Sequence, residues 1–193
     1  MTLKTYAGLA ATGLLAILVV GCGGKSAEEQ FAAAQTRFNE AQHVVDSLKR
    51  KADPVELFTP VALAYEAVAD DHPRSAQAEQ SLFRAAELRS QYLGDVPGAL
   101  ALYKRYAEDF PAAAKAPTAL FMVGYLYNNN LFKPDSAEIA YKKFLELYPQ
   151  SELVTSAQYE LQMIGKKPED MIPNPVIPVD TTAPPKTKRP AAR

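Results

Sequence analysis

Residues 141–149 read Tyr-Lys-Lys-Phe-Leu-Glu-Leu-Tyr-Pro, and two earlier segments follow the same pattern without a gap. Residues 103–111 read Tyr-Lys-Arg-Tyr-Ala-Glu-Asp-Phe-Pro, and residues 65–73 read Tyr-Glu-Ala-Val-Ala-Asp-Asp-His-Pro. Each segment begins 38 residues after the one before it, and further apolar positions keep the same register on both sides. A fixed period of this length is typical of repeat proteins, in which each repeat is one supersecondary unit.

Apolar residues within each repeat are spaced as on one face of a helix. The three stripes are Val61, Ala64, Tyr65, Val68 and His72; Ala99, Leu102, Tyr103, Tyr106 and Phe110; and Ala137, Ala140, Tyr141, Phe144 and Tyr148. Proline cannot continue a helix, so Pro73, Pro111 and Pro149 are expected to end the three helices. Turn residues at 95–98, 128–130 and 133–135 are expected to separate the paired helices of the second and third repeats.

The third repeat resembles the tetratricopeptide (TPR) signature, through Leu120, Val123, Gly124, Tyr127, Ala137, Tyr141 and Pro149. The resemblance implies an all-α, TPR-type array of helical hairpins (an α-solenoid) over residues 26–165, with about three repeats and a capping helix from Ser151 to about Ile164. It also implies that Gly124 and Ala137 let two helices approach closely, with Tyr127 and Tyr141 filling the seam. The longer period is similar to that of the outer-membrane assembly lipoprotein (BamD) family.

The first repeat departs from this pattern. Ser26 and Glu29 have the spacing of a capping box, which predicts a helix from there to about Arg50. Asp53-Pro54 and Thr59-Pro60 are expected to flank the second helix, because proline is unfavourable inside one.

The N-terminus is typical of a targeting segment. Ala7–Val20 carries no charge, and as a helix it would rise about 21 Å, short of the roughly 30 Å hydrocarbon core. Residues 1–21 are therefore predicted to be a cleaved signal peptide. Val19-Val20-Gly21-Cys22 resembles a lipobox, which implies lipidation (palmitate among the acyl chains) of Cys22, with residues 22–25 as a flexible tether. No Asp follows Cys22, which by the same resemblance implies the periplasmic face of the outer membrane.

The composition gives little support for a catalytic, metal-binding or cofactor-binding function. The chain of 193 residues has a formal charge of −1, two His and one Cys. We find no nucleophile motif, phosphate-binding loop or metal-ligand spacing, so the sequence predicts no enzyme activity, no metal and no cofactor. The near-zero charge does not favour nucleic acid as a partner.

The C-terminal residues 166–193 contain seven prolines and few large apolar side chains. Such a segment cannot bury enough surface to offset its ordering entropy, so we expect a disordered tail that is partly polyproline-like. Its end is basic. The tail is interpreted either as a spacer that reaches through the cell wall or touches anionic partners, or as a solvated tail without a partner.

The first helices of the hairpins carry the candidate partner groove, because in TPR arrays these helices line the concave side. The register assigns to it Phe83, Glu87, Phe121, Tyr125, Asn128 and Tyr159. Phe83, Phe121 and Tyr159 alternatively pack between adjacent repeats, and Asn128 alternatively serves the turn. The resemblance implies a scaffold for envelope proteins, including β-barrel assembly components; the alternatives are a cell-division or secretin-pilotin adaptor, or a protein that binds a small ligand or peptidoglycan.

Overall fold

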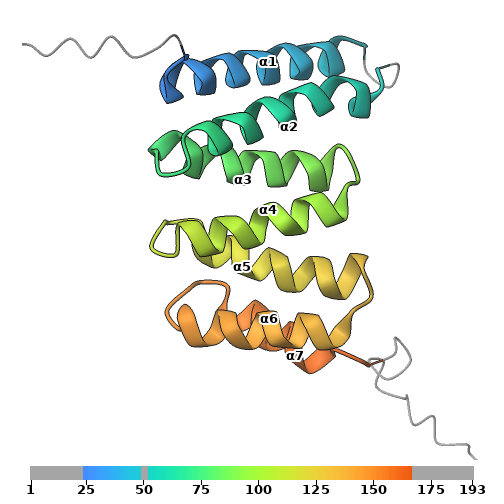
Figure 1. Ribbon diagram of the computed structural model, residues 1–193. Coiled ribbons are helices and arrows are strands. Elements are labelled where there is room, and N and C mark those ends of the chain that lie inside the picture. Colours follow the sequence, from blue (N-terminus) through green and yellow to red (C-terminus); the bar gives the residue numbers. More distant parts are fainter. Residues whose placement is uncertain (1–23, 49–51, 167–193) are drawn as a thin grey trace, which may run out of the picture. The chain divides into compact units, whose positions relative to one another are not determined.

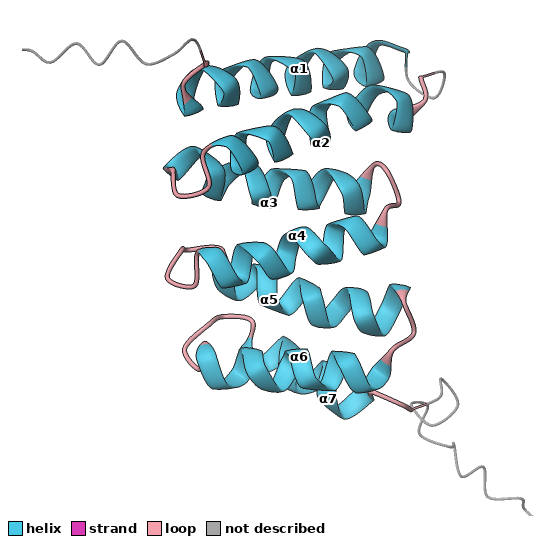
Figure 2. Cartoon of the chain, viewed as in Figure 1, coloured by secondary structure: helices cyan, strands magenta, loops and turns pink. Residues whose placement is uncertain are grey.

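The computed structural model describes residues 24–48 and 52–166, and these residues form helices and loops without a strand (Figure 2). The all-α prediction is thereby confirmed. The predictions about the signal peptide, Cys22 and the tail beyond Lys166 lie outside the described residues. The elements are α1 (Ala27–Leu48), α2 (Pro54–Asp71), α3 (Ala76–Gln91), α4 (Val96–Asp109), α5 (Ala116–Tyr125), the π-helical turn η2 (Leu126–Asn130), α6 (Pro134–Leu147) and α7 (Val154–Met163).

The chain divides into two compact units between Gly94 and Asp95. In the N-terminal unit, α2 packs against both α1 and α3. Phe58 of α2 is fully buried there, with its ring 5.9 Å from that of Phe38 and 4.1 Å from that of Tyr92. Arg89 of α3 donates two hydrogen bonds to the Glu66 carboxylate of α2, at 2.6 and 2.8 Å. An apolar core and a bidentate ion pair therefore hold this unit together.

In the C-terminal unit, α5 packs against α4 and α6, and α7 packs against α6 (Figure 1). Tyr141 and Phe144 of α6 are fully buried in its core. Their positions follow from the predicted stripe, because residues three and four apart lie on the same face of a helix. Tyr65 and Tyr103, which hold the register position of Tyr141, are also buried, with 2% of their surface exposed.

Side-chain caps start several of these helices. The predicted capping box at the start of α1 is present: Ser26 N–H donates to Glu29 Oε2 at 2.9 Å, and Glu29 N–H donates to Ser26 Oγ at 3.2 Å. Ser75 and Asp95 cap α3 and α4 by accepting from the N–H groups of Ala78 and Gly98. Such caps satisfy backbone donors that have no partner within the helix.

The helix ends predicted by the three prolines are equivalent in backbone conformation. The last helical residues are followed by His72, Phe110 and Tyr148, with φ of −133°, −130° and −128° and ψ of 56°, 54° and 55°. In each case the backbone carbonyl of this residue accepts a hydrogen bond of 3.0 Å from the N–H group three positions later. The 38-residue register of the sequence is thus also a register of backbone geometry.

Gly124 of α5 lies directly against the ring of Tyr141 of α6. A Cβ atom at this position would lie 2.6 Å from Cε1 and 2.8 Å from Cδ1 of the Tyr141 ring. The expectation that Gly124 permits a close approach, with Tyr141 in the seam, is confirmed.

Three predictions about helix boundaries were wrong. Pro97 and Gly98, which were expected in the break between paired helices, lie in the first turn of α4. Pro60 lies inside α2, which begins at Pro54. The buried residues Phe58, Val61 and Ala62 surround this proline, so burial outweighs the lost backbone hydrogen bond. The asparagines 128–130 continue the helical path of α5 as the turn η2, and the break follows at residues 131–133.

Candidate functional site

Three aromatic side chains gather on one face of the C-terminal unit. Helices α5 and α7 border a shallow cavity of about 460 Å³, which we call the aromatic surface; it is lined by Phe121, Tyr125, Thr155, Ser156, Tyr159 and Glu160. On each helix the lining residues recur four positions apart, and side chains with this spacing share one face of the helix.

The aromatic residues differ in exposure. Phe121 is half-buried, with its ring 5.5 Å from that of Tyr141 and 6.0 Å from that of Phe144. Tyr125 and Tyr159 are 40% and 56% exposed. Phe121 therefore belongs to both the core and the surface, whereas the two tyrosines offer ring faces and hydroxyls to a ligand.

Polar groups lie beside and beneath these rings. Asn128 Nδ2 donates to Glu160 Oε2 at 3.3 Å. The hydroxyl of Tyr141 is buried without a hydrogen-bond partner. Burial, and to a smaller extent the Glu160 carboxylate, raise the pKa of Tyr141 above its usual value. The hydroxyl therefore keeps its proton, and Glu160 is the carboxylate at the edge of the aromatic surface.

The predicted groove residues are divided between the two units. Phe121, Tyr125 and Tyr159 line the aromatic surface, and Asn128 contacts its edge through Glu160. Phe83 lies in the N-terminal unit and is only 5% exposed. Glu87 lies in the same unit, with its Oε2 atom 3.2 Å from Nη1 of Arg84. It borders a smaller cavity of about 110 Å³.

Thr155, Ser156 and Glu160 were not predicted. A sequence signal for them exists, because Thr155 lies one helical turn before Tyr159 and Ser156 lies one helical turn before Glu160. That side became recognisable as part of a surface only once α7 was placed against α6.

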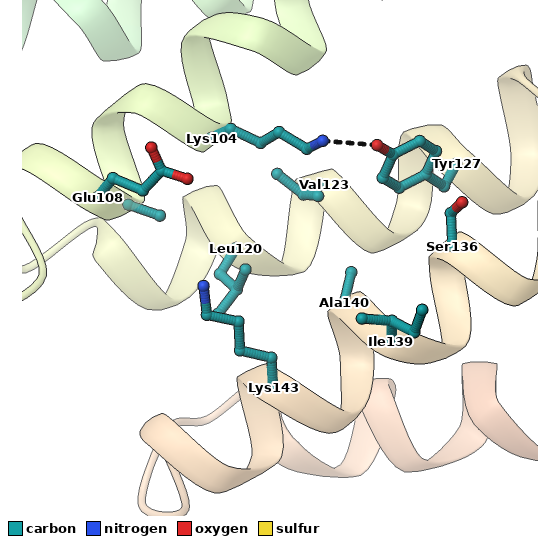
Figure 3. A pocket seen from close by; sticks show the side chains of 10 residues that line it. Lys104, Glu108, Leu120, Val123, Tyr127, Ser136, Ile139, Ala140 and Lys143 are labelled. Atoms are coloured by element: carbon teal, nitrogen blue, oxygen red, sulfur yellow. Dashed lines mark hydrogen bonds between the residues drawn. The ribbon is translucent and has the colours of Figure 1, made fainter.

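A second cavity, of about 330 Å³, lies between α4, α5 and α6 (Figure 3). Lys104 Nζ donates to the Tyr127 hydroxyl at 2.6 Å and lies 4.9 Å from the centroid of that ring. Leu120, Val123 and Ala140 supply apolar lining, and Lys143 and Glu108 add charges. Tyr127, which was predicted to fill the seam of the hairpin, thus borders this cavity.

Other kinds of site receive no support from the described part of the chain. Residues 24–48 and 52–166 contain no group of His, Cys, Asp and Glu side chains that could hold a metal ion. Within these same ranges, none of the helices has the length and apolar character needed to cross a membrane.

Comparison with known families bears on the repeats. The tetratricopeptide repeat model matches residues 80–113 and residues 118–151. The chain contains tetratricopeptide repeats. The two matched segments begin 38 residues apart, which is the register deduced from the tyrosines and prolines. No curated protein matches the chain. The fold is thus a TPR-type array of helical hairpins, and such repeats imply protein partners in general.

Proposed function

We propose that this protein is a non-catalytic, lipid-anchored adaptor that binds segments of other envelope proteins on the aromatic surface. The observation that supports this is the exposure of two tyrosines: Tyr125, 40% exposed on a matched tetratricopeptide repeat, and Tyr159, 56% exposed on α7, the helix that follows it. Tyrosine is enriched at protein interfaces because its ring buries apolar area while its hydroxyl forms a hydrogen bond.

The proposed anchor is Cys22. Support comes from the sequence Val19-Val20-Gly21-Cys22, which resembles a lipobox, and from the apolar segment before it. The proposed location is the periplasmic face of the outer membrane, because no Asp follows Cys22. The similarity to the outer-membrane assembly lipoproteins makes β-barrel assembly components the first partners to test.

Replacing both Tyr125 and Tyr159 by alanine is expected to reduce partner binding at least about tenfold, because aromatic anchors carry much of the energy of an interface. Helix content should not change, because neither side chain is buried in the core. The measurement is affinity purification of the full chain from membranes after cross-linking, with recovered proteins quantified by mass spectrometry.

The matched control for this experiment is Leu147→Ala, since Leu147 is 52% exposed on α6 and lies outside the aromatic surface. It should leave recovery unchanged. Recovery of a β-barrel assembly component in stoichiometric amount would support the assembly role. Full recovery of partners by the double tyrosine variant would show that the surface is not the binding site.

Replacing Cys22 by serine is expected to leave the precursor uncleaved and to change its membrane fractionation, because the thiol is the group that accepts the lipid. Processing can be followed by the shift in mobility and by labelling with a palmitate analogue. Adding Ser26→Cys to this variant returns a thiol to the chain outside the tetrad and should not restore processing. A lipid-labelled, normally cleaved Cys22→Ser chain would contradict the proposed anchor.

A second candidate function is the binding of a small ligand or wall polymer. The cavity beside Lys104 favours it, because its volume of about 330 Å³ lies within the range of small-molecule sites. Retention of the purified chain on peptidoglycan, with no protein recovered in the cross-linking experiment, would support this function over the adaptor.

A further inference from the structure

The aromatic surface has the features that bind proline-rich, basic peptides. Phe121, Tyr125 and Tyr159 present three rings, and Glu160 places a carboxylate beside them. Proline rings pack well on aromatic faces, and a polyproline II helix is already extended, so it loses little entropy on binding. Tyrosine hydroxyls can donate to its carbonyls, which have no partner within that helix.

The charge at this surface is available to a cation. The side chain of Asn128 donates to Glu160, but among residues 24–48 and 52–166 no Lys, Arg or His pairs with this carboxylate. A basic side chain next to the rings would therefore gain a partner without displacing another cation. An occupant that combines prolines with positive charge fits both properties.

The chain itself contains such a segment. Ala183-Pro184-Pro185-Lys186-Thr187-Lys188-Arg189-Pro190 has three prolines and three cations and no acidic residue. The other proline-rich stretch, residues 172–180, has three prolines but no cation, and it ends in Asp180. Charge complementarity with Glu160 therefore favours the segment 183–190 over the segment 172–180.

The length of the intervening chain allows this contact. Helix α7 ends at Met163, one turn beyond Tyr159, so the chain leaves the helix close to the aromatic surface. Residues 167–182 connect this point to Ala183, and at about 3.1 Å per residue they can extend on the order of 50 Å. This length is much greater than the one helical turn that separates Met163 from Tyr159, so residues 183–190 can reach the aromatic surface. Because the segment is tethered, its effective concentration at this surface is high.

We infer that residues 183–190 bind to the aromatic surface of the same molecule and occupy it until a partner displaces them. This inference rests on the proposed function, because it assigns a regulator to the same surface. The prolines pack on the rings of Tyr125 and Tyr159, and Lys186 or Lys188 pairs with Glu160. A partner then has to compete with the tail, and the surface is shielded while it has no partner.

The test is photo-cross-linking within the full chain. A benzoylphenylalanine at position 187 should cross-link to the peptides that contain Tyr125 and Tyr159, as identified by mass spectrometry. The same probe at position 176 is the control and should give much less of these products. Equal yields from the two positions, or no product from position 187, would overturn the inference.

Charge and stoichiometry are tested with the same probe. Glu160→Gln keeps an acceptor for Asn128 but removes the charge. It should lower the yield of the cross-link from position 187 about threefold, as expected for a partly exposed ion pair. Glu146→Gln, which alters an exposed acid of α6, should have no effect on this yield.

In a mixture of chains labelled with heavy and with light nitrogen, each cross-linked product should join two peptides that carry the same isotope. Mixed products would mean that the tail binds a second copy, which contradicts self-occupancy.

The two proposals fail in different ways. If the probe at position 187 does not reach the surface while the double tyrosine variant still loses its partners, only self-occupancy is wrong. If the cross-links form while that variant keeps its partners, only the adaptor site is wrong. When both hold, Pro184→Ala combined with Pro185→Ala and Lys186→Glu should increase partner recovery.

Discussion

Replacing Phe144 by alanine is expected to lower the free energy of unfolding by about 3–5 kcal/mol. The side chain is fully buried, and its ring centroid lies 6.0 Å from those of Phe121 and Tyr148. Truncation loses the transfer free energy of the ring and leaves a cavity that the neighbouring rings cannot fill. Domains of this size are stable by about 5–15 kcal/mol, so this one substitution removes a large share of the total.

Urea denaturation of the full chain, followed by far-UV circular dichroism, measures this loss. Leu147→Ala on the same helix is the control, because Leu147 is 52% exposed and its truncation should change stability by no more than about 0.5 kcal/mol. A similar small effect of Phe144→Ala would contradict the assignment of Phe144 to the core of the C-terminal unit.

Gly124→Ala is expected to destabilise the protein by about 1–2 kcal/mol, although alanine is the better helix former by about 1 kcal/mol. The added methyl group would lie 2.6–2.9 Å from three atoms of the Tyr141 ring. That ring is fully buried, so it cannot move aside without disturbing its neighbours. Steric overlap therefore outweighs helix propensity.

A double-mutant cycle with Tyr141→Leu isolates the clash, because the smaller side chain leaves room for the methyl group. Thermal denaturation of the four proteins should show a much smaller penalty for Gly124→Ala in the Tyr141→Leu background. If Gly124→Ala alone raises stability by the amount that helix propensity predicts, α5 and α6 are not in close contact here.

The fold could be predicted from the sequence because each repeat carries the same burial pattern. The phase of Tyr65, Tyr103 and Tyr141 predicts three buried positions, and all three are at most 2% exposed. Two local features could not be predicted from this repeated burial pattern. Pro60 is tolerated because the residues around it are buried, and the π-helical turn at Leu126–Asn130 has no sequence pattern that distinguishes it from a loop.

The candidate site was less predictable than the fold. Tyr125 and Tyr159 could be selected as aromatic residues at helical spacing, but the burial of Phe83 depends on how α3 packs within its unit. Glu160 was missed for a similar reason, since its place beside Asn128 depends on how α7 packs against α6. Periodicity indicates which residues share a face, and only the packing of helices decides which faces remain open.

The matching backbone at His72, Phe110 and Tyr148 has a consequence for how such a chain can evolve. An imidazole, a phenyl and a phenol all occupy this position with nearly the same φ and ψ. The conformation of this helix end, which we call the joint, therefore depends on the main chain and the following proline rather than on one side chain. Duplication or loss of a 38-residue segment between two prolines therefore leaves every joint intact. Gene-level copying can change the length of the protein in whole modules while each module keeps its own sequence free to specialise.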